Sequence, residues 1–336
     1  MTARIFSDRF YEVGTRVPAW TRLGTTVVNT MTATQAFTDL GEYDTHLLPM
    51  YADAGGVKLA TRTRLIVRPH VQKDGSVSYD SFGTVGPGYT IITPRDVVTA
   101  LDYALSDAPV STIGAPDEGR LFFVGYDLPG GDVAGDDVSN MLLITCPNDG
   151  RGGIKIMRVT VRLICVNGLV SRVVSESYSI SHGLNVADKL ARWLAEMWPR
   201  EMKRSIETMA AYEQMTKRRV SDLQAAKLTD KLVRTPKAPT PTPSPADNEK
   251  RHQDWMYRVE RARKEQEGIN RLFRGEGVGM DTPAAAGTAW GWFNAVAEYY
   301  DHAIDKRNVS GAVADALFGQ AARLKENAYQ MALSAR

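Results

Sequence analysis

The sequence predicts an α+β fold, in which an antiparallel, β-rich N-terminal half with short helices is followed by a helical C-terminal region. In 57–71 and in 155–166, apolar and polar residues alternate with period two, which is typical of half-buried strands. After residue 185, apolar residues recur three and four positions apart, as along one face of a helix. Between 235 and 245, five prolines and no large apolar residue predict an extended linker.

The first predicted elements are a helix and a hairpin. Residues 30–40 predict a short helix with Thr32 as its N-cap. The strand at 57–71 is followed by Asp74-Gly75, a pair suited to a hairpin turn, and 76–85 are expected to return antiparallel.

A second helix and three further strands complete the β-rich half. Thr93 and Pro94 predict the start of a helix that ends near residue 105. Short apolar runs predict strands at 120–126 and 140–146, and the alternating 155–166 is the last strand. A Gly- and Asp-rich segment between the first two is interpreted as a solvated loop; its acids are Asp132, Asp136 and Asp137.

The predicted organisation has four parts. A mixed core with the antiparallel sheet spans 1–185, and a long helical segment spans 186–234, in which Pro199 is expected to bend or restart the helix. The Pro-rich linker is 235–247. The helical C-terminal region, 248–336, holds a charged helix and two closing helices and is expected to pack back on the core.

Charge is unevenly distributed along a chain whose net charge is only +2. Residues 39–149 hold 7 basic and 16 acidic residues, a balance of −9, whereas 151–234 hold 16 basic and 8 acidic residues, a balance of +8. The basic segment is a candidate phosphate-binding surface, and the alternative is that the two oppositely charged segments face each other.

Composition and cysteine placement predict a cytoplasmic globular protein. With 43% hydrophobic and 24% charged residues, the chain can build an ordinary core without a metal or disulfide. Cys146 and Cys165 both lie in apolar, β-branched stretches, as buried free thiols do. The N-terminal residues do not resemble a signal peptide, and no apolar run approaches the ~20 residues of a membrane span.

Four stretches carry a resemblance to one protein family. They are 19–25 (AWTRLGT), Asn148-Asp149-Gly150, 162–167 (RLICVN) followed by Ser181-His182, and 294–299 (NAVAEY) with 318–325 (FGQAARLK). In this order they resemble the domain of unknown function 932 family over nearly the whole chain. The resemblance implies a phage, prophage or plasmid context in a bacterial host cell and implies no particular reaction.

The chain departs from this family's pattern at three places. Ser181 stands where an Arg commonly precedes the His, and Gly168 stands where a Thr usually follows the Asn. The Pro-rich linker looks like an insertion. The Arg–His pair of the family's pattern is therefore incomplete in this chain.

No motif indicates a metal or a cofactor, and we predict neither. The histidines make no HxxxH pattern and the cysteines no CxxC pattern. The Gly-rich segments 86–88 and 275–279 lack the Lys-Ser/Thr ending of a phosphate-binding loop and are interpreted as turns.

Cys165 and His182 are a candidate nucleophile and base, with Asn167 or Asp149 as the third group. Because Cys165 falls on the apolar face of its strand, a buried structural thiol is the favoured interpretation. Asp149 and His182 remain the catalytic candidates.

Two basic strand faces are the candidate nucleic-acid-binding residues. Arg62, Arg64, Arg68 and His70 line one strand, and Arg158 and Arg162 line another. If the two strands share a sheet, these side chains form a groove for the phosphates of a single strand, with Tyr89 or Tyr79 stacking on bases. The alternative is a solvated face whose arginines pair with local acids.

The favoured hypothesis is a non-enzymatic protein that binds or anneals single-stranded nucleic acid in DNA replication or recombination, with a homo-oligomer as an open option. One alternative is an enzyme or host-defence modulator whose polar site near Asp149, Arg162, Asn167 and His182 converges on one pocket. Another is a structural or partner-binding protein that uses its final helices.

Overall fold

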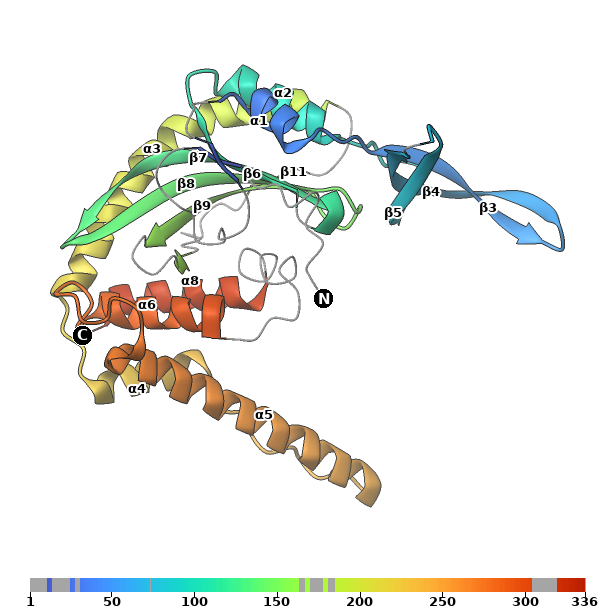
Figure 1. Ribbon diagram of the computed structural model, residues 1–336. Coiled ribbons are helices and arrows are strands. Elements are labelled where there is room, and N and C mark those ends of the chain that lie inside the picture. The colour runs from blue at the N-terminus through green and yellow to red at the C-terminus, as the bar shows by residue number, and fades with distance from the viewer. Residues whose placement is uncertain are drawn as a thin grey trace.

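A computed structural model describes residues 11–13, 25–27, 31–72, 74–115, 117–162, 167–169, 178–180, 185–303 and 319–335. It confirms the α+β architecture: two β-sheets in the N-terminal half precede a helical C-terminal region (Figure 1). Cys165 and His182 lie outside the described residues.

The larger sheet has the strand order β10-β9-β8-β7-β6-β1-β2 among the described residues, with β11 also paired to β9. All its described pairs are antiparallel except β1 with β2. The strands are β1 Tyr11–Val13, β2 Thr25–Val27, β6 Val110–Gly114, β7 Leu121–Val133, β8 Asp136–Pro147, β9 Ile154–Arg162, β10 Asn167–Leu169 and β11 Tyr178–Ile180.

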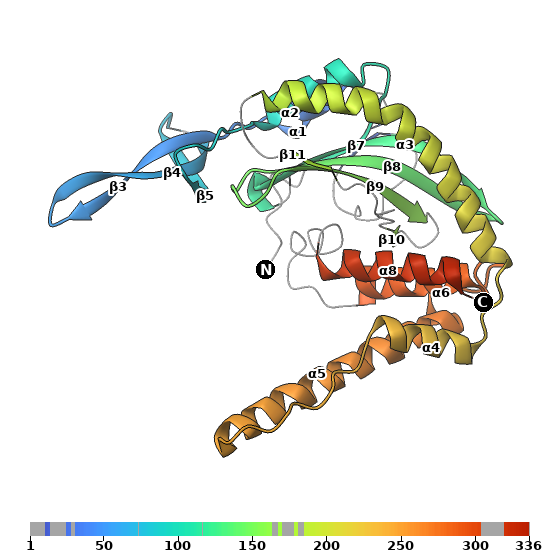
Figure 2. The same cartoon turned by 180° about the vertical axis from the view of Figure 1, so that it is seen from behind.

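The smaller sheet is antiparallel, with the order β3-β4-β5, and projects from the body of the molecule (Figures 1 and 2). Its strands are β3 His46–Ala54, β4 Val57–Val71 and β5 Val77–Val85. The predicted hairpin between β4 and β5 is confirmed, and Gly75 takes the positive φ of 82° that its turn requires.

The helices follow the sequence signals closely. Thr32 and Thr93 each accept a hydrogen bond from the backbone N–H three residues on, and both form complete capping boxes. The helices are α1 Ala33–Leu40, α2 Pro94–Ala104, α3 Val186–Lys217, α4 Asp222–Leu232, α5 Pro245–Arg271, α6 Ala289–Glu298 and α8 Gln320–Ser334. None of the helices in the described part of the chain has both the length and the apolar composition needed to cross a membrane.

Helix α3 determines how the C-terminal region meets the sheet. It is one helix of 32 residues that continues through Pro199 and curves around the sheet instead of restarting (Figure 1). Its first half packs Leu190 and Leu194 into the apolar core formed with α1, α2 and the sheet. In its second half, Glu201 and Tyr212 contact polar residues of β9, Arg158 and Thr160.

A second core lies among the last helices and buries Trp290, Trp292 and Phe293 completely. The predicted linker separates α4 from α5, but it lies along α5 and does not stand free. The Trp255 indole donates to the Pro236 carbonyl at 2.9 Å, and the Gln266 amide donates to the Val233 carbonyl at 2.7 Å.

Two expectations about the strands are wrong. The Gly- and Asp-rich segment is not a solvated loop, because β7 and β8 continue through it to a tight turn at Ala134-Gly135, and Asp136 is buried. The strand at 57–71 is not half-buried along its length, because Val57 and Leu59 are both more than half exposed.

Candidate nucleic-acid interface

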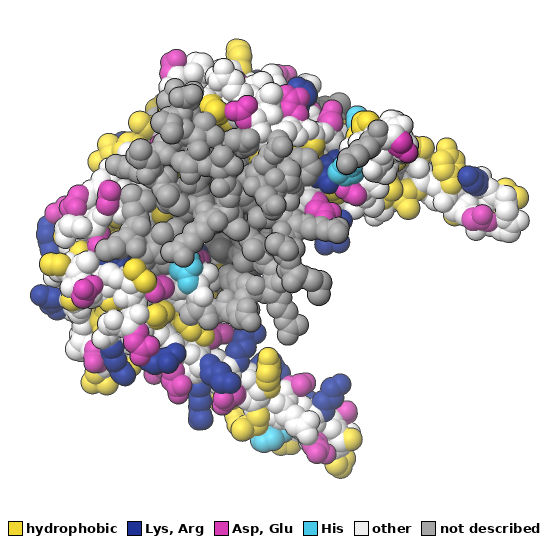
Figure 3. Space-filling model, viewed as in Figure 1, with side chains coloured by type: hydrophobic (Ala, Val, Ile, Leu, Met, Phe, Trp, Pro, Cys, Tyr) yellow, Lys and Arg dark blue, Asp and Glu magenta, His cyan; other side chains and the backbone are white. Residues whose placement is uncertain are grey.

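The smaller sheet forms an arm, residues 46–85, that stands away from the body. Strand β5 pairs with β4 only over residues 64–71 of β4. Beyond that point, residues 50–63 form a two-stranded ribbon, here called the outer arm, and every residue of 51–62 is exposed. Figure 3 shows hydrophobic, basic and acidic side chains along the arm, with no other described segment over them.

The arm is anchored where its base meets the turn between β8 and β9. Gly83 lies so close to that turn that a Cβ there would stand 2.2 Å from the Asp149 carbonyl oxygen. Gly150, at φ 77°, lies under Val85 and Ile66 of the arm. The Asn148-Asp149-Gly150 stretch therefore docks the arm to the body.

Polar contacts fix the same junction. The Arg68 guanidinium donates to Asp80 at 2.6 Å and to the carbonyl of Glu118, whose backbone is left-handed at φ 56°. On the body side, Arg120 donates to the Ser81 carbonyl at 2.9 Å. These contacts tie the base of the arm to residues 118–120, which directly precede β7.

His70 completes this cluster. It contacts the Asp80 carboxylate, which also accepts a hydrogen bond from the Arg68 guanidinium. Burial raises the pKa of Asp80, but hydrogen bonds from His70 and Arg68 outweigh it and hold that pKa below its ordinary value. Arg68 and His70 therefore make contacts within the junction. This placement disfavours their predicted role on an open binding face.

The two faces of the outer arm differ in chemistry. Cross-strand partners share a face in an antiparallel ribbon, so the pairs Tyr51–Ala60 and Asp53–Lys58 define one face. The pairs Ala52–Leu59 and Ala54–Val57 define the other, which carries no charged residue. The outer arm thus has a polar, partly basic face and an apolar face, both exposed.

The remaining predicted binding residues, in the arm and just after it, lie near the polar face. Arg62 is exposed and falls in the register irregularity of the β3–β4 ladder. Arg64 is half-buried on the polar face and donates to the carbonyls of Pro87, at 2.9 Å, and Tyr89. Tyr89 is half-buried, and burial raises its pKa well above its ordinary value. Lys58 and Tyr51, which no pattern in the sequence singled out, are exposed here as well.

The predicted continuous groove of arginines from both strands is wrong. Strands β4 and β9 belong to different sheets, and Arg158 and Arg162 are 6% and 0% exposed. Arg158 contacts Glu201 of α3 at 3.5 Å. Binding of nucleic acid by other residues of the chain stays a prediction.

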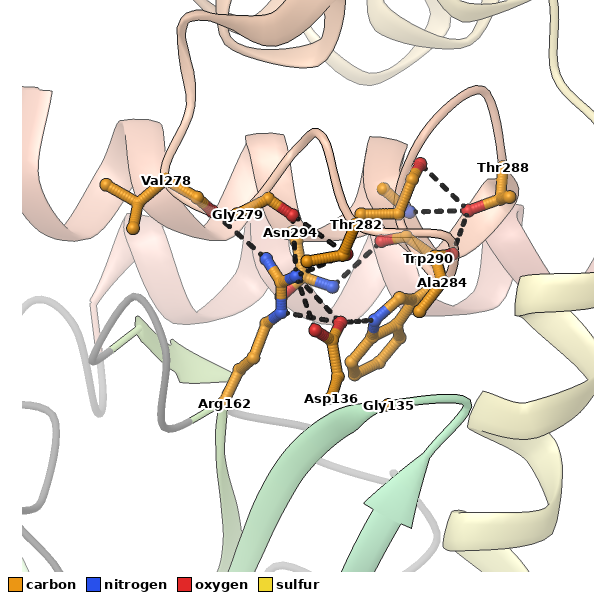
Figure 4. A network of polar contacts seen from close by, with 12 residues as sticks. Gly135, Asp136, Arg162, Val278, Gly279, Thr282, Ala284, Thr288, Trp290 and Asn294 are labelled. Carbon is orange, nitrogen blue, oxygen red and sulfur yellow. Dashed lines mark hydrogen bonds and ion pairs between the residues drawn. The ribbon is translucent and has the colours of Figure 1, made fainter.

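Arg162 is the centre of a buried polar network (Figure 4). Its Nε and Nη2 donate to the two carboxylate oxygens of Asp136 at 2.8 and 2.9 Å. It also donates to the carbonyls of Val278 and Gly279, at 3.2 and 2.9 Å. The Trp290 indole donates to the same carboxylate at 2.7 Å. This network joins the sheet to the C-terminal helices, which favours a structural role for Arg162.

The alternative polar site does not assemble, because its acidic member, Asp149, and its basic member, Arg162, lie far apart. Asp149 precedes β9 and Arg162 ends it, so the length of a nine-residue strand, about 30 Å, separates them. Asn167 pairs in register with Arg162, at the end of β9 away from Asp149. Asp149 and Arg162 therefore do not share a pocket. No group of three His, Cys, Asp or Glu side chains in the described residues is arranged to hold a metal ion.

Cys146 is expected to resist alkylation in the folded protein. It is fully buried on β8, and burial raises its pKa to about 12, so at pH 8 the reactive thiolate is scarce. Iodoacetamide treatment at pH 8, followed by mass spectrometry of the Cys146 peptide, should show little modification in buffer and full modification in urea. Equal modification rates in both conditions would contradict this placement.

Comparison with known proteins gives one family. The model of the family described as Domain of unknown function (DUF932) matches residues 81–322. The chain belongs to the DUF932 family. The DUF932 match begins within β5 and ends within α8, so it includes the docking turn and the Arg162 network, while the outer arm precedes it. No curated protein and no solved structure matches the chain.

Proposed function

We propose that the protein is a non-enzymatic nucleic-acid-binding protein of a phage or plasmid, and that it contacts single strands through the polar face of the outer arm. The observation that carries the proposal is the exposed combination of Lys58, Arg62 and Tyr51 on a ribbon that extends from the body. Single-strand binding requires cations that neutralise phosphates and an aromatic ring on which a base stacks. Two-stranded ribbons are an established way to present such groups to nucleic acid.

The burial of the other predicted arginines sharpens this proposal. Arg158, Arg162 and Arg68 each have an acidic partner, so their charge is largely neutralised within the fold. Lys58 shares its face with Asp53, which offsets part of its charge. Binding by the arm is therefore expected to be modest in affinity and strongly salt-dependent. Annealing of complementary strands belongs to the same proposal, as a consequence of holding single strands without reading their sequence.

Titration of a fluorescent single-stranded 30-mer by anisotropy, from 25 to 200 mM salt, tests the proposal. The double variant Lys58→Ala with Arg62→Ala removes two exposed cations and should flatten the slope of log K against log salt by about 1.4. Tyr51→Ala should weaken binding by about 1–3 kcal/mol if a base stacks on that ring.

The matched control is Lys250→Ala with Arg251→Ala, which likewise removes one lysine and one arginine, from exposed positions of α5 outside the basic segment. It should leave the salt slope unchanged. Absence of binding by the unaltered protein at 25 mM salt would refute nucleic-acid binding. Equal losses in both double variants would refute the arm as the site.

A further inference from the structure

Helix α4 and the residues that follow it present exposed cations that the outer arm does not account for. Residues 214–246 hold seven basic and two acidic residues, a balance of +5. Four exposed cations of this segment, here called the α4 row, form no ion pair within the described part of the chain; they are Lys227, Lys231, Arg234 and Lys237. One of the two acids, Asp222, lies 3.6 Å from Arg274, so Asp230 alone remains to offset the row.

The buried face of α4 determines which way its lysines point. Ala225 and Thr229 are buried, and the Thr229 hydroxyl accepts a hydrogen bond from the Trp292 indole at 3.0 Å. Lys227 and Lys231 each stand two positions after one of these buried residues, which is about 200° around the helix. Both lysines therefore point away from the body, on a helix whose position is fixed by its packing against α5 and α8.

The neighbouring helix α5 distributes its charges differently. It holds seven basic and six acidic residues, and Lys264 pairs with Glu260, four positions away. On α4 the same spacing joins Lys227 to Lys231, and like charges at this spacing destabilise a helix. The helix dipole favours a cation in the last turn, which accounts for Lys231 but not for Lys227. An anionic partner would offset the repulsion within the row.

The surroundings of the α4 row favour nucleic-acid phosphates over other anionic partners. A protein interface is built around apolar or aromatic anchors, and the one large apolar side chain that α4 exposes is Leu223. Binding to a membrane surface requires an exposed apolar helix face, whereas the apolar face of α4 is buried among the C-terminal helices. Contact with a phosphate backbone requires only exposed cations.

We propose that the α4 row is a second nucleic-acid contact, which binds the sugar-phosphate backbone without reading the bases. Helix α4 has no aromatic residue on which a base could stack, so the row should accept duplexes and single strands alike. Figures 1 and 2 show α4 at the opposite end of the body from the arm. This inference rests on the proposed nucleic-acid binding, but it does not require the outer arm to be the site.

Anisotropy titration of a fluorescent 30-base-pair DNA duplex, from 25 to 200 mM salt, tests the α4 row. The full chain carries Lys58→Ala with Arg62→Ala throughout, so that the outer arm contributes neither cation. This chain should still bind the duplex at 25 mM salt. Adding Lys227→Ala with Arg234→Ala should flatten the slope of log K against log salt by about 1.8, the effect of two lost phosphate contacts.

The control adds Lys250→Ala with Arg251→Ala instead, which removes one lysine and one arginine from α5 and should leave the slope unchanged. Equal slopes in the α4 and α5 variants, or no duplex binding before either is added, overturn the α4 contact. Neither result bears on the single-strand titrations of the outer arm, so the two sites can fail separately.

Competition with polyglutamate tests the identity of the partner. At the same concentration of negative charge as the duplex, polyglutamate should leave the duplex bound, because the phosphates of a duplex form a denser array of charge. Displacement of the duplex by polyglutamate would make an acidic protein segment the better partner and overturn the assignment to nucleic acid.

Discussion

Replacing Arg162 by Met is expected to lower the free energy of unfolding by about 3–5 kcal/mol, the cost of leaving a buried charge without its partner. Arg162 and Asp136 are both completely inaccessible at their side chains. Removal of the guanidinium leaves the Asp136 carboxylate with the Trp290 indole as its remaining described donor. The carbonyls of Val278 and Gly279 lose a donor as well, so the loop before α6 should loosen from the sheet.

Thermal and urea unfolding, followed by far-ultraviolet circular dichroism, measure this effect. The double variant Arg162→Met with Asp136→Leu should be more stable than Arg162→Met alone, because it removes the orphaned charge along with its partner. Arg151→Met is the surface control: its side chain is 87% exposed, 3.9 Å from Asp149, and its loss should cost less than about 1 kcal/mol. If Arg162→Met unfolds like the control, the network does not hold the two regions together.

Replacing Gly83 by Ala is expected to displace the base of the arm from the docking turn. The added Cβ would stand 2.2 Å from the Asp149 carbonyl oxygen, which is backbone and cannot turn aside as a flexible side chain would. Forcing even one methyl group into a filled contact typically costs about 1–3 kcal/mol. The cost should fall on the junction and leave the core of the larger sheet intact.

Hydrogen exchange with mass spectrometry distinguishes this local effect from a global one. Protection should fall in 81–85 and in 147–151 and remain unchanged in β7 and in α6. Gly86→Ala is the matched control, since a Cβ at that position meets no atom within 4 Å. Unchanged protection in Gly83→Ala would mean that the arm and the turn are not in contact in solution.

Local signals in the sequence predicted the local structure well. The capping residues Thr32 and Thr93 marked where two helices begin, and alternation located β4 and β9, because both signals depend on neighbours within a few residues. The strand β3 was missed, since Pro49 interrupts its pattern. The short strands β1, β2, β10 and β11 were missed because three residues carry no measurable period.

The candidate site was harder to predict because its decisive contacts are distant in sequence. Alternation placed Arg158 and Arg162 on the polar face of their strand, but it could not show that α3 and the loop before α6 cover that face. The partner of Arg162 is Asp136, 26 residues earlier, in a segment whose glycines and acids favour a loop interpretation. In the arm, alternation predicted burial that the structure does not have. Val57 and Leu59 alternate with polar residues as in a half-buried strand, yet no described segment lies over them.

Because the docking turn anchors only the base of the arm, the length of the ribbon can vary. Asn148-Asp149-Gly150 fixes the base of the arm, whereas every residue of 51–62 is exposed. Shortening or lengthening the ribbon by a pair of residues on each strand preserves which side chains share a face and leaves the anchorage unaltered. The Gly55-Gly56 tip is thus a natural point for grafting a foreign loop or a label. The junction at the base of the arm is fixed, whereas the sequence and length of the ribbon can change without altering the packing of the body.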